Sequence, residues 1–152
     1  MFSFSIPKEF EQMLSKISNI DEVAPKMLGA AAPIVISAIK ARTPADSGSL
    51  RDSVKASKPK LNKRGSWMCN IYFDGYETRT LKSGETVKIP NMQKARTLEF
   101  GRRGRINRRA RPDGSIGKGL EAKPFILSAV RDSSEAAANA MQEVFETEAK
   151  TN

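Results

Sequence analysis

Histidine is missing from the 152-residue chain, and cysteine occurs once, as Cys69. A Ser-His-Asp triad, a Cys-His pair and a Cys/His metal cluster are therefore excluded, and an internal disulfide is impossible. Acid–base chemistry by paired carboxylates stays open on composition, but Asp46 and Asp52 lie in a turn region that gives them no defined geometry. We expect no catalytic residue, no cofactor and no metal site.

Long apolar runs are scarce as well. No stretch approaches the roughly 20 apolar residues of a membrane-spanning helix. The first seven residues lack the basic and then apolar regions of a signal peptide. Gly101 and Gly104 do not lie between a strand and a helix, so they do not form a phosphate-binding loop. We predict a single domain over residues 1–152, made and kept in a cytoplasm, with no membrane contact.

Positive charge is abundant and local. Residues 94–118 contain nine lysine or arginine residues against Glu99 and Asp113, so they carry +7 of the chain's net charge of +9. Residues 101–121 are rich in Arg and Gly and poor in apolar groups, which favours a long loop held at both ends. We call residues 101–121 the basic arm. Its candidate contact residues are Arg102, Arg103, Arg105, Arg108, Arg109, Arg111 and Lys118.

Apolar residues at a period of 3.6 predict two helices before residue 44. The first covers residues 7–18. The second covers residues 21–42, with Asp21 as its N-cap. Pro33 is expected to kink or divide this second helix, because proline lacks a backbone donor and clashes with the preceding turn. Thr43, which precedes a proline, is expected to end it.

Alternating apolar residues predict a strand over residues 66–74, and the turn Lys82-Ser83-Gly84-Glu85 predicts a projecting hairpin over about residues 76–90. A short helix is expected at 92–100, and a long apolar stripe predicts a helix that begins at Pro124 and reaches about Glu148. The order of elements indicates an α+β fold: an antiparallel sheet with a projecting hairpin, packed by a kinked N-terminal helix and a long C-terminal helix. The strand residues expected to face the core are Trp67, Cys69, Ile71 and Phe73.

Single residues between these elements have mostly structural interpretations. Pro44, Asp46 and Gly48 predict a tight turn, and we expect Gly48 to adopt a backbone angle that favours glycine. For Glu99 we expect pairing with an arginine or capping of a turn, rather than catalysis. Cys69 is expected to be a small buried hydrophobe.

An Ala/Lys-rich helix is followed by three motifs in the order typical of a known phage family. The first motif is Ala41-x-x-Pro44-x-x-x-Gly48-x-Leu50-x-x-Ser53-Val54, the second is Leu98-Glu99-Phe100-Gly101, and the third is Ala122-x-Pro124-Phe125 before the last helix. The chain resembles the lambdoid "tenth gene product" type of virion-morphogenesis protein, a group of neck, head–tail joining and tail-completion proteins. It departs from that pattern in having Lys94-Ala95 where an aromatic-Ala pair is common, and in its long basic arm. The motif residues expected to be structural are Pro44, Gly48, Leu50, Ser53, Glu99, Phe100, Gly101, Pro124 and Phe125.

The resemblance implies a non-enzymatic structural protein of a tailed bacteriophage virion, assembled in the host cytoplasm. It implies a neck or tail-completion ring that joins the capsid connector to the tail and surrounds the DNA channel. Implied partners are further copies in a cyclic homo-oligomer, most simply a hexamer, other neck and tail proteins, and genomic DNA passing through the channel. Alternatives are a tail terminator ring that caps the tail tube, or a nucleic-acid-binding protein that uses the basic arm.

Three interpretations of the basic arm stay open. It is a solvated loop, a segment that contacts DNA phosphates without reading sequence, or a segment that docks on an acidic surface of a neighbouring subunit. We favour docking, because a tightly basic channel lining would hold back a genome that must slide. No aromatic residue lies between Phe100 and Phe125, so stacking platforms for single strands are missing. Acidic residues on the last helix are the candidate receiving surface: Asp132, Glu135, Glu143 and Glu146.

Overall fold

The computed structural model describes residues 2–5, 20–44, 48–104 and 119–151. The elements are β1 (Phe2–Ser5), α2 (Ile20–Arg42), α3 (Gly48–Asp52), β2 (Val54–Ala56), β3 (Lys60–Leu61), β4 (Trp67–Phe73), β5 (Tyr76–Thr80), β6 (Thr86–Pro90), α4 (Asn91–Phe100) and α5 (Phe125–Thr151). The predicted α+β class is confirmed. The helix predicted over residues 7–18 falls outside the described residues.

The sheet is built around β4. This strand pairs antiparallel with β1 on one side and with β2 and β3 on the other. Cys69, Ile71 and Phe73 are buried and Trp67 is half-buried, as their alternation along the strand predicts. The indole Nε1 of Trp67 donates a hydrogen bond to Asp21 at 3.2 Å.

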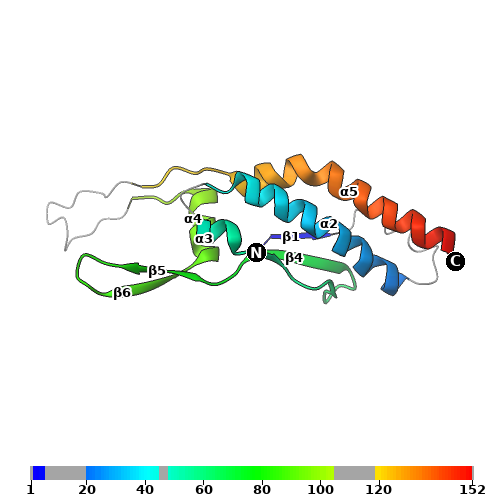
Figure 1. Ribbon diagram of the computed structural model, residues 1–152, viewed down its shortest axis with the longest axis horizontal. Helices are drawn as coiled ribbons and strands as arrows, with labels where there is room; N and C mark the ends of the chain where they lie inside the picture. Colours follow the sequence, from blue (N-terminus) through cyan, green and yellow to red (C-terminus); the bar gives the residue numbers. More distant parts are fainter. Residues whose placement is uncertain (1, 6–19, 45–47, 105–118, 152) are drawn as a thin grey trace.

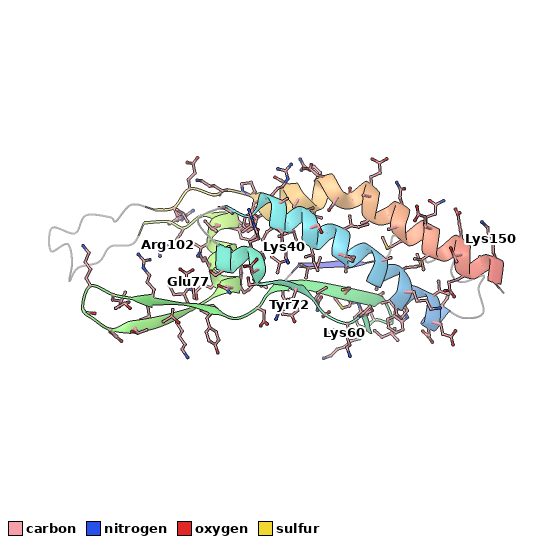
Figure 2. All side chains as sticks on the ribbon, viewed as in Figure 1. Lys40, Lys60, Tyr72, Glu77, Arg102 and Lys150 are labelled. Carbon is pink, nitrogen blue, oxygen red and sulfur yellow. The ribbon has the colours of Figure 1, made fainter. Side chains whose placement is uncertain are left out.

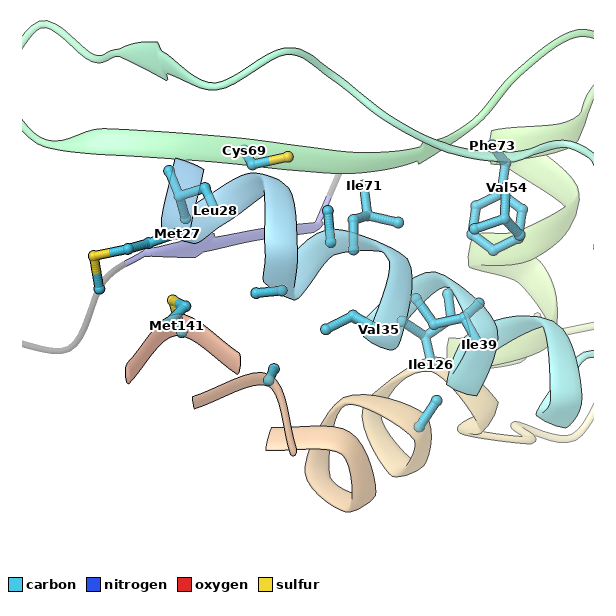
Figure 3. Packing of buried hydrophobic residues seen from close by; sticks show 14 of the residues in the cluster. Met27, Leu28, Val35, Ile39, Val54, Cys69, Ile71, Phe73, Ile126 and Met141 are labelled. Carbon is cyan, nitrogen blue, oxygen red and sulfur yellow. The ribbon is translucent and has the colours of Figure 1, made fainter. Parts of the chain in front are cut away.

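Helix α2 lies between the sheet and α5, and the two helices run antiparallel along the length of the molecule (Figure 1). Two ion pairs join them near opposite ends. Lys26 Nζ lies 2.8 Å from Glu148 Oε1, and Arg42 pairs with Asp132. Figure 3 shows Met27, Leu28, Val35 and Ile39 of α2 between the sheet and Met141 and Ile126 of α5.

Helix α2 continues through both of its prolines, Pro25 and Pro33, as a single element. Of the two expected effects of Pro33, a kink or a division, the division does not occur. Pro33 is exposed, and so is Gly29, whose carbonyl loses its helical partner. Water can therefore hydrogen-bond that carbonyl. The helix also begins one residue earlier than predicted, so Asp21 lies inside its first turn, where a carboxylate complements the helix dipole.

One helix among the described residues, α2, is long and apolar enough to cross a membrane by length and composition. The expectation that no stretch approaches this length needs correction for α2. In the fold, however, α2 contributes eight buried residues to the core between the sheet and α5. A core helix meets the same criteria of length and composition.

The last helix, α5, begins at Phe125, directly after Pro124. The ring of Phe125 packs edge-on against Phe73 of β4, with centroids 6.2 Å apart. The residues of the predicted stripe are buried or half-buried, except Ala136, which is exposed. Ser133 is buried on the same face, where its hydroxyl donates a hydrogen bond to the carbonyl of Ala129 at 2.8 Å.

The predicted hairpin is formed by β5 and β6 and projects from the body as a two-stranded sheet (Figure 1). Gly84 has a φ of 83°, as its turn requires. The amide of Leu81 donates to the carbonyl of Glu85 at 2.8 Å, which closes the turn. All residues from 80 to 86 are exposed.

Candidate assembly surface

Glu99 connects the end of α4 to the start of α5. Its carboxylate is buried and accepts hydrogen bonds from the amides of Ile126 at 2.8 Å and Leu127 at 2.9 Å. These amides belong to the first turn of α5, which has no helical acceptors for them. The negative charge also complements the helix dipole there. Glu99, which belongs to α4, therefore caps the N-terminus of α5. Of its two expected roles, pairing with an arginine or capping, the structure shows capping.

Gly101 ends α4 in a conformation that only glycine adopts readily, with φ 71° and ψ −177°. A side-chain carbon at this position would lie 2.6 Å from the carbonyl oxygen of Leu120. A side-chain carbon at Gly119 would lie 2.5 Å from the carbonyl oxygen of Arg102. Both glycines therefore permit a close backbone approach at the base of the basic arm.

The two described ends of the basic arm are hydrogen-bonded to each other. Arg102 and Leu120 form an antiparallel bridge, with amide-to-carbonyl distances of 2.8 and 2.7 Å. The amide of Lys123 also donates to the carbonyl of Leu98 at 2.8 Å. Of the candidate contact residues, Arg102 and Arg103 are exposed at this base. The others lie outside the described residues: Arg105, Arg108, Arg109, Arg111 and Lys118.

The first motif joins α2 to the sheet. Leu50 is buried in the core, and the hydroxyl of Ser53 donates to the carbonyl of Leu50 at 2.7 Å. The expectation for Gly48 was wrong: it is the first residue of α3, its φ is not positive, and a side-chain carbon there would meet nothing within 4 Å. The remainder of the predicted turn, residues 45–47, lies outside the described residues.

The outer face of α4 lines an open groove of about 590 Å³. Phe100 is the most exposed large apolar residue of those described, at 67% of its full surface. Sequence analysis placed Phe100 in a motif but did not predict a groove, because the other lining residues come from the end of β6 and from α4 together. The lining residues are Pro90, Met92, Gln93, Arg96, Thr97, Phe100 and Gly101.

A family model described as "Bacteriophage HK97-gp10, putative tail-component" matches residues 8–101. The chain belongs to the HK97-gp10-like family. This membership makes it a structural component of a phage tail, associated with the virion, and confirms the resemblance found in the sequence. The match covers the first motif and the residues through Gly101, and it ends where the basic arm begins. No curated protein and no solved structure matches the chain.

In this HK97-gp10-like chain, the hairpin and the base of the basic arm leave the body at the same end, on either side of α4 (Figure 1). Figure 2 shows Arg102 and Glu77 at this end, and Lys60 and Lys150 toward the other. The hairpin is tied to α4 near its base by an ion pair between Glu77 and Lys94. Within the hairpin, the ammonium of Lys88 lies over the ring of Tyr76, 5.2 Å from its centroid.

The predicted acidic surface of α5 is partly engaged within the chain. Asp132 pairs with Arg42, and Glu146 accepts a hydrogen bond from Gln142 at 2.9 Å. The carboxylates of Glu135 and Glu143 are exposed and form no ion pair within the described residues. These two positions, eight residues apart, lie on one face of the helix.

Three titrating groups of the body have pKa values that are shifted for clear physical reasons. Burial raises the pKa of the Cys69 thiol, which donates to the carbonyl of Ser57 at 3.1 Å. The pKa of Asp74 is lowered, chiefly by its hydrogen bond to Lys55 at 2.6 Å and then by the amide of Gly75. The same hydrogen bond raises the pKa of Lys55.

Proposed function

We propose that this HK97-gp10-like protein is a non-enzymatic ring subunit of the phage neck or tail-completion complex. Copies of the chain form a closed ring, most simply of six, around the channel through which the genome passes. The ring joins the capsid connector to the tail. Other neck and tail proteins contact its two faces, and the protein assembles in the host cytoplasm before it enters the virion.

The observation that carries this proposal is the gathering of projecting parts at one end of the molecule. The hairpin and the base of the basic arm both leave the body beside α4, while the core lies in the sheet, α2 and α5. Parts that project from a folded body without a core of their own suit contacts with other chains. Family membership as a tail component supplies the class of partner.

The basic arm is proposed to dock on an acidic surface of a neighbouring subunit. Arg102 and Arg103 are exposed at its base, and Glu135 and Glu143 are exposed on α5. Arginine binds carboxylates through paired N–H donors, which gives such contacts geometric specificity. Repeated around a ring, contacts that are individually weak combine into a stable assembly.

The direct test of the ring is the mass and symmetry of the purified protein, from light scattering and negative-stain averaging. We expect a closed cyclic assembly. A single monomeric copy in a finished virion contradicts the proposal. Phage that lack the protein also distinguish a joining ring from a tail terminator ring. Detached tails of normal length indicate a joining role, while tails of irregular length indicate a terminator that caps the tube.

The role of the basic arm is tested by replacing five of its arginines with alanine: Arg102, Arg103, Arg105, Arg108 and Arg109. We expect a folded protein, shown by an unchanged circular dichroism spectrum, and a loss of head–tail joining in complementation assays. The matched control removes exposed cations near β3 by replacing Lys58, Lys60, Lys63 and Arg64 with alanine, and should retain joining. Infectious particles from the arm variant contradict the docking role.

A nucleic-acid-binding function for the basic arm is tested separately by filter binding of the purified protein to duplex DNA over a salt series. Phosphate contacts release counterions, so such binding weakens steeply as salt rises. Docking on protein predicts no binding at moderate salt. Tight binding with a steep salt slope, abolished in the five-arginine variant, establishes the DNA-binding function in its place.

A further inference from the structure

The tip of the hairpin is uncovered on all sides in the single chain. Residues 80–86 are all exposed, and Leu81 retains 42% of its surface. A two-stranded hairpin standing alone is marginally stable in water, since it lacks a third strand or a helix to cover it. The tip therefore has the properties of an element that another molecule covers.

The residues that line the groove on α4 are chemically complementary to those of the hairpin tip. Its wall combines the exposed ring of Phe100 with the half-buried side chain of Met92. One cation, Arg96, lines it and forms no ion pair with the described residues. At the hairpin tip, Glu85 is exposed and likewise forms no ion pair with the described residues. The groove thus offers an apolar wall and one cation, and the tip offers one leucine and one carboxylate beside the exposed Lys82.

We propose that the hairpin tip of one copy occupies the α4 groove of a second copy. Leu81 packs against Phe100 and Met92 of the receiving copy, and Glu85 pairs with its Arg96. The inference rests on the proposed ring and adds to it the surfaces by which neighbouring subunits join.

The position of the groove favours a contact between copies over a contact within one chain. Of the residues that line the groove, Pro90 is the last of β6 and Met92 lies in the first turn of α4, so the groove lies at the hairpin's own base. The strands carry the tip away from that base (Figure 1), by roughly 15–20 Å for five residues and a turn. A contact between the tip of one copy and the base of the next uses two different surfaces. Repetition of such a contact closes a ring when the rotation permits.

Disulfide trapping between two single-cysteine variants tests the contact. Tagged Lys82→Cys protein is mixed with untagged Gln93→Cys protein under mild oxidation, and the mixed dimer is identified by its intermediate mass. Lys82 neighbours Leu81 at the tip, and Gln93 lines the groove. Cys69 is buried and its raised pKa keeps the thiol protonated, so it should stay unreactive. The matched control pairs Lys82→Cys with Lys60→Cys on β3, toward the other end of the molecule.

We expect a strong mixed dimer from the Lys82 and Gln93 variants and little from the Lys82 and Lys60 variants. If light scattering shows a ring but neither pair links, the groove contact is wrong and the ring survives. Equal linking in both pairs also overturns the groove contact. A protein that stays monomeric at every concentration overturns the groove contact and the proposed ring together.

Charge reversal provides an independent test by double-mutant cycle. Glu85→Arg and Arg96→Glu should each weaken self-association about ten-fold, and the two reversals combined in one chain should restore most of it. Both side chains are exposed, so the fold of the monomer should not change. A groove filled by the basic arm or by another phage protein predicts no rescue in the combined variant, and that result overturns the proposal.

Discussion

The helical body and the α4 end of the molecule contrast in how they use apolar side chains. In the body, Leu28, Ile39 and Ile126 have no exposed surface, and α2 is covered on two sides. At the α4 end, Phe100 and Leu81 face solvent. Leu61 of β3 and Leu127 of α5 are also exposed, but only at the α4 end does an exposed apolar side chain line the described groove, which the proposed contact between copies would cover.

The junction between the two regions shows that the motif residues have mixed roles. Glu99 and Gly101 serve the fold, because they cap α5 and close the base of the basic arm. Phe100 lies between them in sequence and is exposed. Of three consecutive motif residues, the first and the last therefore stabilise the fold, and the middle one exposes its phenyl side chain to solvent.

The sharpest test of this contrast compares two leucine-to-alanine changes. Leu28→Ala should lower the free energy of unfolding by about 3 kcal/mol, because it leaves a cavity in the core. Leu81→Ala should change it by less than about 0.5 kcal/mol, because the side chain is exposed. Urea denaturation of both proteins as monomers measures the difference. Similar losses would show that the hairpin is part of the cooperative core.

Two glycine-to-alanine changes compare a tightly packed junction, at Gly101, with an open one, at Gly48. Gly101→Ala should lower the free energy of unfolding by about 2–3 kcal/mol, because the new methyl group meets backbone atoms and the conformation favours glycine. Gly48→Ala meets no neighbour and should lie within about 0.5 kcal/mol of the parent. Thermal and urea unfolding give both values, and a harmless Gly101→Ala would contradict the closed junction.

The cap contributed by Glu99 is tested by two replacements of different character. Glu99→Ala should cost about 2 kcal/mol of unfolding free energy, because the buried amide of Ile126 and the part-buried amide of Leu127 lose their acceptor. Glu99→Gln keeps one carbonyl oxygen as acceptor and should cost less. Denaturation curves rank the variants. Equal losses would indicate that the negative charge or the second acceptor oxygen supplies the whole effect, and that one retained carbonyl oxygen does not cap the helix.

The smallest expected effect is the pH dependence of the exposed Lys55–Asp74 pair. The pKa of Asp74 is lower in the folded protein than in the unfolded chain, so the pair stabilises the fold above the ordinary carboxyl pKa. This contribution disappears as the pH falls through the lowered value. Stability measured from pH 6 to about pH 2 should therefore fall slightly more for the parent than for Asp74→Asn.

Sequence patterns predicted most of the body because its information is local. The period of apolar residues located α2 and α5, alternation located β4, and a glycine turn located the hairpin. The choice between a kink and a division at Pro33 needed the fold, because a proline on the solvent face leaves the unpaired carbonyl of Gly29 to water. Gly48 misled because a glycine in a turn region does not always have a positive φ.

The candidate surface was less predictable because its parts are distant in the sequence. Glu99 and the amide of Ile126 are separated by 27 positions, so the choice between pairing and capping needed the fold. The groove joins the end of β6 to the outer face of α4, and no local pattern gives its width. Only the concentration of positive charge at residues 94–118 indicated beforehand which end of the molecule differs from the rest.

The bridge between Arg102 and Leu120 makes the chain between them an exchangeable insert. Because the two backbones already meet at Gly101 and Gly119, the scaffold requires only that something connect Gly104 to Gly119. A short linker, a foreign peptide or a fluorescent domain placed there should leave the helices and sheet intact.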